Sequence, residues 1–406
     1  GDFQWSCRRM MGEPCMFYFL RYKVGASPDT AETVIMLIHT DDADMIGGSE
    51  EMFDVICQAC DKKWKIKIVE SDFMLGVKRV LVDDGKEFSV ELSMTAYIDG
   101  VVEAFKDELP KHVNTPFPEH TKGFISKYDK VSDEETERYM GKGYMRMCGL
   151  LLWCARNCFP ECAVGISFMC RVMSRPSKLA YEAGLHMIQW LSQNRLRGIK
   201  FSHDPNSLPV FFSDASDKSD PTDSCKQYGY CGMWQGGPFC YVSKKLSHVG
   251  HHAMHNEYMA LAEAGKAIVW MRQLLTELDH DYLLDTPTVL YGDNNAANSL
   301  TSEHFVSSGN QYIYLPYHAI KEWTELCMIK VARKASCDNI SDLFTKHVSA
   351  GTVKKLLDRL CGYHPDAHMT RLLHLHDDRE SDVLYALMSR MEISIDDRYA
   401  VCMIEF

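Results

Sequence analysis

The chain has 406 residues, 46% of them hydrophobic, which is enough for two or three globular units with cores of their own. No apolar run approaches the roughly 20 residues that span a bilayer, and the first residues mix charged with polar and aromatic groups, so neither a membrane helix nor a signal peptide is expected. The formal net charge of −12 argues against indiscriminate binding to nucleic acid, which depends on an excess of Lys and Arg.

Residues 33–48 form the first distinctive pattern, in which two apolar segments flank Asp41 and Asp42. Such a pattern predicts a β-hairpin that presents both carboxylates at its tip. A two-metal site needs more ligands than this pair supplies. An ordinary hairpin turn is the structural alternative for the two aspartates.

Residues 111–205 predict a mainly helical region. Apolar residues recur at three-and-four spacing in 134–157 and in 179–194. Trp190 lies on the second apolar stripe, so packing explains it better than contact with a nucleic-acid backbone. Residues 204–207, which include a proline, predict a linker to the next domain.

Four carboxylates recur in similar settings further along the chain. Asp214 and Asp293 each follow a short apolar strand, whereas Glu257 and Asp342 begin amphipathic segments with helical spacing. Carboxylate oxygens are the hard ligands that Mg²⁺ prefers. Four of them suit a site that holds two divalent cations about 3.5–4 Å apart. A single Asp in an acidic chain is usually a solvated surface group, so the hypothesis depends on the ordered set.

The elements around these carboxylates predict a mixed α/β sheet. Residues 228–234 and 239–242 predict two strands that form an antiparallel meander with the strand of Asp214. Residues 288–291 and 327–331 predict two more strands, which extend the sheet after a helix.

These motifs resemble the ribonuclease H domain of copia-type (Pseudoviridae) retrotransposon Pol polyproteins. The matching stretches are residues 213–217, 229–230, 243–245, 257–261, 293–294 and 341–346. The hairpin of Asp41 and Asp42 resembles the Tyr-Val-Asp-Asp hairpin of a reverse transcriptase palm, with His39 and Thr40 in place of Tyr and Val. Further reverse transcriptase stretches match residues 12–17, 73–77 and 144–151.

The resemblance implies a combination of α/β and α+β units. Residues 1–110 would be a truncated reverse transcriptase palm, and residues 111–205 a helical thumb and connection region. Residues 206–362 would be a ribonuclease H-like mixed sheet flanked by helices. Residues 363–406 remain an unassigned C-terminal extension, with a helical pattern in 372–391.

The resemblance also implies an enzyme that hydrolyses RNA in RNA–DNA hybrids. Asp214, Glu257, Asp293 and Asp342 would bind two Mg²⁺ or Mn²⁺ ions and catalyse the reaction. The first palm aspartate and the fingers are missing, so the remnant palm is not expected to polymerise alone. The alternative from another class is a catalytically inactive nucleic-acid-binding or assembly module derived from a retrotransposon.

Six residues beside these motifs are candidate contacts to the hybrid: Lys244, Lys245, Asn294, Asn295, Tyr317 and His318. The asparagine amides could bond the 2′-hydroxyls that distinguish RNA from DNA. Capping of a helix over 294–300 explains them equally well.

The expected partner is an RNA–DNA hybrid, and a dimer with a longer Pol subunit would supply the missing fingers. The resemblance implies a location in the cytoplasm with virus-like particles, or in the nucleus, and no membrane association.

Two other clusters invite a metal site and are interpreted otherwise. Cys57 and Cys60 have CxxC spacing but no second pair to complete a zinc site, so they are expected to pack in a helix. The histidines before Glu257 are expected to be solvated in a loop: His248, His251, His252 and His255.

Overall fold

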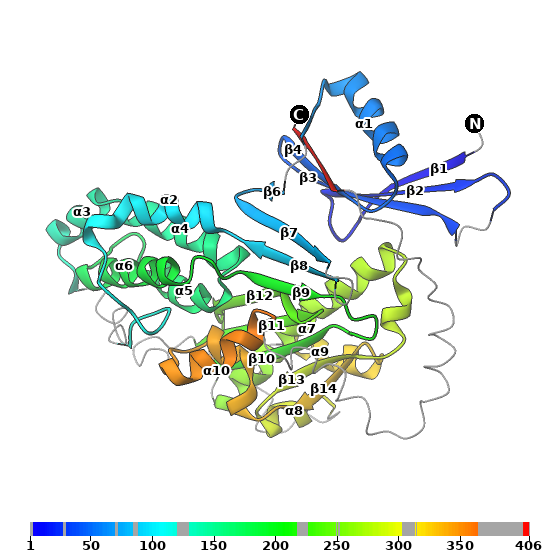
Figure 1. Cartoon of the computed structure of the whole chain (residues 1–406). Helices are drawn as coiled ribbons and strands as arrows, with labels where there is room; N and C mark the ends of the chain where they lie inside the picture. The colour runs from blue at the N-terminus through cyan, green and yellow to red at the C-terminus, as the bar shows by residue number, and fades with distance from the viewer. Residues whose placement is uncertain are drawn as a thin grey trace. The chain divides into compact units, whose positions relative to one another are not determined.

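The computed structural model describes residues 3–26, 30–69, 72–83, 88–119, 130–216, 226–248, 250, 252–302, 313, 315–363 and the backbone of 401–405. The chain divides into two compact units (Figure 1). Unit 1 comprises Gly1–Leu75, Trp270–Leu284 and Leu372–Phe406, and unit 2 comprises Gly76–Val269 and Asp285–Arg371. The helical pattern predicted for 372–391 lies outside the described residues, as do Asp217 and His251.

Unit 1 is built on an antiparallel sheet in the order β1-β2-β3-β4-β15-β5. The strands of this unit are β1 (Phe3–Arg9), β2 (Met16–Lys23), β3 (Glu32–His39), β4 (Asp42–Ile46), β5 (Lys67–Val69), β6 (Phe73–Met74) and β15 (Val401–Glu405). Helix α1 (Glu50–Trp64) begins at Ser49, whose side chain accepts a hydrogen bond from the backbone N–H of Met52. Met52 and Phe53 then pack with Val34 and Met45 of the sheet.

The predicted acidic hairpin is confirmed. His39 pairs with Asp42 across a turn of two residues, Thr40 and Asp41. Thr40 has a φ of 58°, which the primed turns of two-residue hairpins require. The packing interpretation of the CxxC motif is also confirmed, because Cys57 lies on the buried face of α1 and belongs to the core of this unit.

The helices of unit 2 are α2 (Thr95–Phe105), α3 (Asp133–Gly141), α4 (Tyr144–Asn157), α5 (Ala163–Arg171) and α6 (Lys178–Gln193), with 3₁₀ turns η2 (Lys106–Glu108) and η5 (Pro160–Cys162). Trp190 is packed as predicted, and its indole N–H donates to Glu161 Oε1 at 3.0 Å. Glu161, which is buried, also forms an ion pair with the partly buried Arg197. Among the helices that the structure describes, none is both long and apolar enough to cross a membrane.

A small antiparallel sheet accompanies these helices, with β7 (Val77–Asp83), β8 (Phe88–Ser93) and β9 (Ile199–Ser202). Strand β8 comes from before the helices and β9 from after them, so the sheet joins the two ends of the helical region. The prediction of a linker at residues 204–207 is wrong. Asp204 and Ser207 are buried, and the Asp204 N–H donates to Gln235 Oε1 at 2.6 Å, so this segment is a packed turn.

The remainder of unit 2 is a five-stranded mixed sheet in the order β12-β11-β10-β13-β14. Its strands are β10 (Val210–Ser216), β11 (Gln227–Trp234), β12 (Gly237–Lys245), β13 (Thr288–Gly292) and β14 (Ile329–Arg333). Strands β10, β11 and β12 form the predicted antiparallel meander, and β13 and β14 extend it in parallel. The helical elements of this part of unit 2 are α8 (Asn295–Leu300), α9 (Ala319–Glu325), α10 (Ala350–Leu360), η7 (Leu315–His318), η8 (Ser336–Asp338) and η9 (Ile340–Phe344). Helix α7 (Ala253–Glu277) belongs to unit 2 as far as Val269, and its last residues and η6 (Asp281–Leu284) belong to unit 1. The mixed α/β architecture and the predicted order of strands are therefore confirmed.

The 3₁₀ helix η9 lies directly against the sheet at Gly229. This glycine pairs with Asp214 across β10 and β11, and a Cβ atom there would lie 2.4 Å from the Cβ of Phe344. A glycine is therefore required at this position, because any side chain would push η9 away from the sheet.

We expect Gly229→Ala to lower the free energy of unfolding by about 1–3 kcal/mol, the usual cost of overpacking. The measurement is the urea midpoint of the full chain. Gly149→Ala is the matched control, since Gly149 is exposed on α4 and an added methyl group there would meet no neighbouring atom within 4 Å. That control should be neutral or stabilising by about 0.5–1 kcal/mol. Equal midpoints for the two variants would show that η9 does not depend on this close approach.

Candidate metal centre

Two of the four predicted carboxylates lie on adjacent strands. The parallel pairing of β10 with β13 ends at Phe212 and Tyr291, whereas the antiparallel pairing of β10 with β11 continues to Ser216. Asp214 therefore lies within β10, not at the strand end that the sequence predicted, but beyond the last residue paired with β13. Asp293 directly follows β13, so both carboxylates lie where the carboxyl ends of the two parallel strands meet.

The third carboxylate comes from helix α7. Glu257 lies in the first turns of this helix, and its Oε2 accepts a hydrogen bond of 3.1 Å from the backbone N–H of Ala215. Ligand oxygens of Asp214, Glu257 and Asp293 all lie within 4.8 Å of one another. No other group of three or more His, Cys, Asp or Glu side chains in the described part of the chain meets this criterion.

The fourth carboxylate, Asp342, approaches from η9. The predicted amphipathic helix is here a five-residue 3₁₀ helix. Asp342 is outside the group of three, yet it is linked to that group through Lys346, whose Nζ lies 2.8 Å from Asp342 Oδ1 and 3.7 Å from Asp214 Oδ2. The hydroxyl of Thr345 also donates to Asp214 Oδ2.

Two further polar side chains that the sequence reasoning missed hold this arrangement. The buried amide of Asn339 donates to the carbonyl of Ser213 at 3.0 Å, which fixes η9 beside β10. The hydroxyl of Ser336 donates to Asp293 Oδ2 at 2.6 Å. Of the contacts around the carboxylates, the sequence could have predicted the ion pair of Lys346 with Asp342, because the two residues have the i,i+4 spacing that favours ion pairs.

Three carboxyl groups of the cluster have raised pKa values, so they keep their protons to higher pH than isolated carboxyl groups. Burial raises the pKa of Asp214 above its usual range, against the effects of Lys346 and Thr345. Burial, with the charges of Asp214 and Asp293, raises the pKa of Glu257 to about 10. Burial and the charge of Asp214 likewise raise the pKa of Asp342 to about 6. A cation placed among these groups would relieve the repulsion that causes these shifts.

The donor set fits hard divalent cations. The group consists only of carboxylates, without the Cys or His ligands that favour zinc or copper. Backbone or hydroxyl hydrogen bonds orient each of the three carboxylates, as outer ligands do in metal sites. Asp214, Glu257 and Asp293 are therefore the residues that could hold a divalent cation, and Asp342 lies next to this group.

The structure assigns packing or capping roles to several of the candidate nucleic-acid contacts. Asn294 caps α8 by accepting from the N–H of Ala297, as the capping alternative predicted. Tyr317 is only 3% exposed, so most of its side chain is packed. His318 bonds the hydroxyl of Tyr258 at 3.0 Å.

The remaining candidates are accessible. Lys244 and Lys245 are exposed at the end of β12, and Asn295 is exposed at the start of α8. Their contact with a hybrid stays a prediction.

The predicted loop histidines divide into two kinds. His248 and His252 are exposed, as expected of solvated groups. The prediction is wrong for His255, which is only 2% exposed. Helix α7 begins at Ala253, earlier than the sequence pattern indicated, and it carries His255 into the packed part of the unit.

Comparison with known proteins relates the chain to transposons. No family model matches it. It is 25% identical over 356 residues to the retrovirus-related Pol polyprotein from transposon TNT 1-94 of Nicotiana tabacum, which covers 87% of this chain and 26% of that protein. It is 24% identical over 318 residues to the retrovirus-related Pol polyprotein from transposon RE1 of Arabidopsis thaliana, which covers 78% of this chain and 21% of that protein. The chain is similar to transposon Pol polyproteins.

The predicted resemblance to retrotransposon Pol polyproteins is thus confirmed, although the chain spans only about a quarter of the length of these relatives. Its assignment to the copia type stays a prediction. Among solved structures, the chain aligns with the N-terminal RNase H domain of rv2228c from Mycobacterium tuberculosis, which was solved as a fusion with maltose-binding protein. The sequence identity is 11% and the TM-score is 0.24, and the alignment covers 37% of this chain and 99% of that chain. A TM-score this low carries no argument about the fold.

Glu257→Gln tests the electrostatics of the metal-free site. A pKa raised from 4.5 to about 10 means that the folded state keeps this proton to higher pH than the unfolded state. The stabilising contribution is therefore complete below about pH 4.5 and is lost as the pH rises through this window. Glutamine cannot titrate, so in EDTA the variant should gain stability over the parent between pH 5 and about pH 8. Urea midpoints across this range check the prediction, and parallel pH profiles for the two proteins would contradict it.

Proposed function

We propose that the chain is a retrotransposon Pol fragment whose unit 2 is a metal-dependent ribonuclease that cuts the RNA strand of RNA–DNA hybrids. The observation that carries the proposal is the convergence of Asp214, Glu257 and Asp293 from two strands and a helix, with oxygens within 4.8 Å of one another. The similarity to Pol polyproteins over 87% of the chain supports the same assignment.

The residues of this chain orient the oxygen ligands before a cation arrives. The N–H of Ala215 fixes the Glu257 carboxylate, and the Ser336 hydroxyl fixes that of Asp293. Preorganised ligands of this kind need no rearrangement during the reaction, which is the main protein contribution in such sites.

The reaction is a hydrolysis. The oxygen of a water molecule attacks a phosphorus of the RNA strand, and the bond from that phosphorus to the 3′-oxygen breaks. The products are a 3′-hydroxyl and a 5′-phosphate. Bound divalent cations would lower the pKa of the attacking water and stabilise the charge on the leaving oxygen.

The net charge of −12 restricts how the hybrid is held. Part of the acidity belongs to the metal centre itself, where cations would neutralise it. Lys244 and Lys245, exposed on β12 of the same sheet, offer phosphate contacts that position a backbone without reading its sequence. The hybrid would therefore bind through local positive charge, with a strong dependence on salt and on the divalent cation.

The acidic hairpin of unit 1 has no part in the proposed reaction. Asp41 and Asp42 stand at the tip of a hairpin and belong to no carboxylate group within the described residues. We therefore expect this pair of carboxylates to support no RNA-directed DNA synthesis by itself.

Cleavage of an end-labelled RNA–DNA hybrid in Mg²⁺ or Mn²⁺ tests the proposal. We expect Asp293→Asn to reduce the cleavage rate by at least about 10²-fold, because it removes one charged ligand from the centre. Asp358→Asn is the matched control, since Asp358 is exposed on α10 and lies outside the carboxylate group. The control should cleave like the parent.

Two results would point elsewhere. Absence of cleavage by the folded parent in either cation would remove the enzymatic proposal. Hybrid binding that needs no divalent cation and survives Asp214→Asn, with no cleavage, would instead identify a catalytically inactive nucleic-acid-binding module.

A further inference from the structure

Lys346 touches carboxylates from two separate elements. Its Nζ lies 2.8 Å from Asp342 Oδ1 on η9 and 3.7 Å from Asp214 Oδ2 on β10. Among the residues that the structure describes, it is the only basic side chain in ion-pair contact with either aspartate. The ammonium group therefore lies beside two carboxylates that are also close to each other.

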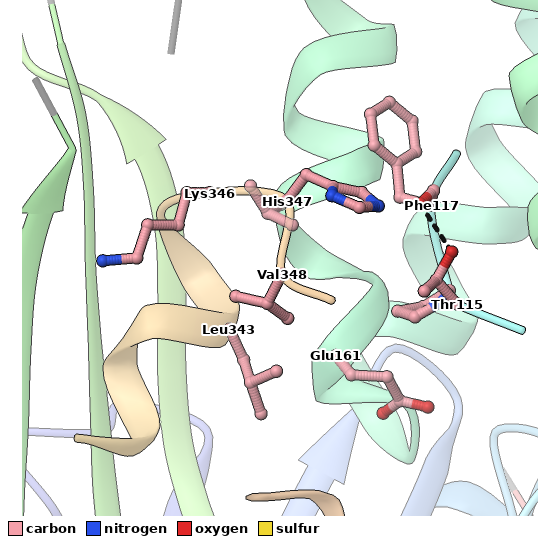
Figure 2. A pocket seen from close by; sticks show the side chains of 9 residues that line it. Thr115, Phe117, Glu161, Leu343, Lys346, His347 and Val348 are labelled. Atoms are coloured by element: carbon pink, nitrogen blue, oxygen red, sulfur yellow. Dashed lines mark hydrogen bonds between the residues drawn. The ribbon is translucent and has the colours of Figure 1, made fainter. Parts of the chain in front are cut away.

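The backbone that carries Lys346 is held firmly, while the tip of its side chain is not enclosed. Leu343, Phe344 and Thr345 are buried before it, and the Thr345 hydroxyl donates to Asp214. Figure 2 shows the Lys346 side chain extending to the opposite side of its loop from His347, which points toward Phe117. The Lys346 side chain is 41% exposed, so the ammonium can move to solvent without crossing the core.

We propose that Lys346 is a built-in counter-ion, which occupies a position beside both Asp214 and Asp342 and yields it to a divalent cation. The inference rests on the metal centre proposed above and assigns this lysine a role that is separate from catalysis. Lys346 is a positioning residue, since it acts through the two aspartates.

Charge and geometry both support an exchange of this kind. An ammonium and a divalent cation are both attracted to the two carboxylates, and they cannot occupy one position together. The monovalent ammonium neutralises one charge, whereas Mg²⁺ neutralises two and binds oxygen ligands directly. The exchange sets the Mg²⁺ concentration at which the centre fills, because binding must displace Lys346 first.

The test is a Mg²⁺ titration of the full chain, followed by the rise in melting temperature, so that it needs no catalytic activity. Lys346→Gln removes the competing charge and keeps polar atoms at the position. Lys346→Arg keeps the charge. Lys355→Gln is the control outside the centre, since Lys355 is also exposed and pairs with Asp338.

We expect Lys346→Gln to melt at a lower temperature than the parent in EDTA, and to reach half-saturation at a Mg²⁺ concentration at least about tenfold lower. Lys346→Arg and Lys355→Gln should stay close to the parent. Equal or weaker Mg²⁺ binding by Lys346→Gln would overturn the proposal, because a lysine that merely supports the two aspartates gives that result.

The outcomes separate this proposal from the proposed function. A parent that binds Mg²⁺ and a Gln variant that binds no tighter would overturn only the role of Lys346. Absence of Mg²⁺ stabilisation in both proteins would remove the metal centre as well. A Gln variant that is unfolded in EDTA should fold as MgCl₂ is added, and failure to fold at any Mg²⁺ concentration would also overturn the proposal.

Discussion

Repulsion between carboxylates in a buried setting is the constraint on which this structure depends. Asp214, Glu257 and Asp293 bring their oxygens within 4.8 Å of one another, and Asp214 is only 2% exposed. Such a cluster opposes folding unless something offsets its charge. The chain supplies partial compensation through the Thr345 hydroxyl and the Lys346 ammonium. Burial and the remaining repulsion raise the pKa of Asp214, of Glu257 and of Asp342.

The fold holds these groups together by fixing η9 against the meander. Asn339 donates to the carbonyl of Ser213. On the neighbouring strand, Gly229 leaves room for Phe344 of η9. Both contacts lie next to Asp214 or directly across the strands from it, at positions 213 and 229. The backbone thus brings the residues that follow η9 to the central strand, where their side chains reach the carboxylates. A defect in this packing would act on the metal centre without touching a ligand.

The short apolar runs before Asp214 and Asp293, bounded by turn residues, indicated two strands, whereas their adjacency came from the order of elements in the resembled domain. Contacts that depend on where an element begins or how it docks could not be predicted. His255 is buried because α7 starts earlier than the pattern indicated, and 204–207 are packed because Gln235, distant in sequence, bonds Asp204. The spacing of Lys346 from Asp342 indicated their ion pair, but nothing in the sequence indicated the contact of Lys346 with Asp214 on β10.

The two acidic motifs of the chain differ in how many structural elements contribute their carboxylates. At the hairpin, Asp41 is exposed and Asp42 is the first residue of β4, and neither belongs to a carboxylate group in the described part of the chain. Asp41 lies in the turn and Asp42 begins the following strand, so one local element would have to supply every ligand of a site there. The centre of unit 2 avoids this restriction by taking each ligand from a different element. Convergence of separate elements, more than the number of acidic residues, is what distinguishes the carboxylate group of unit 2 from the acidic hairpin of unit 1.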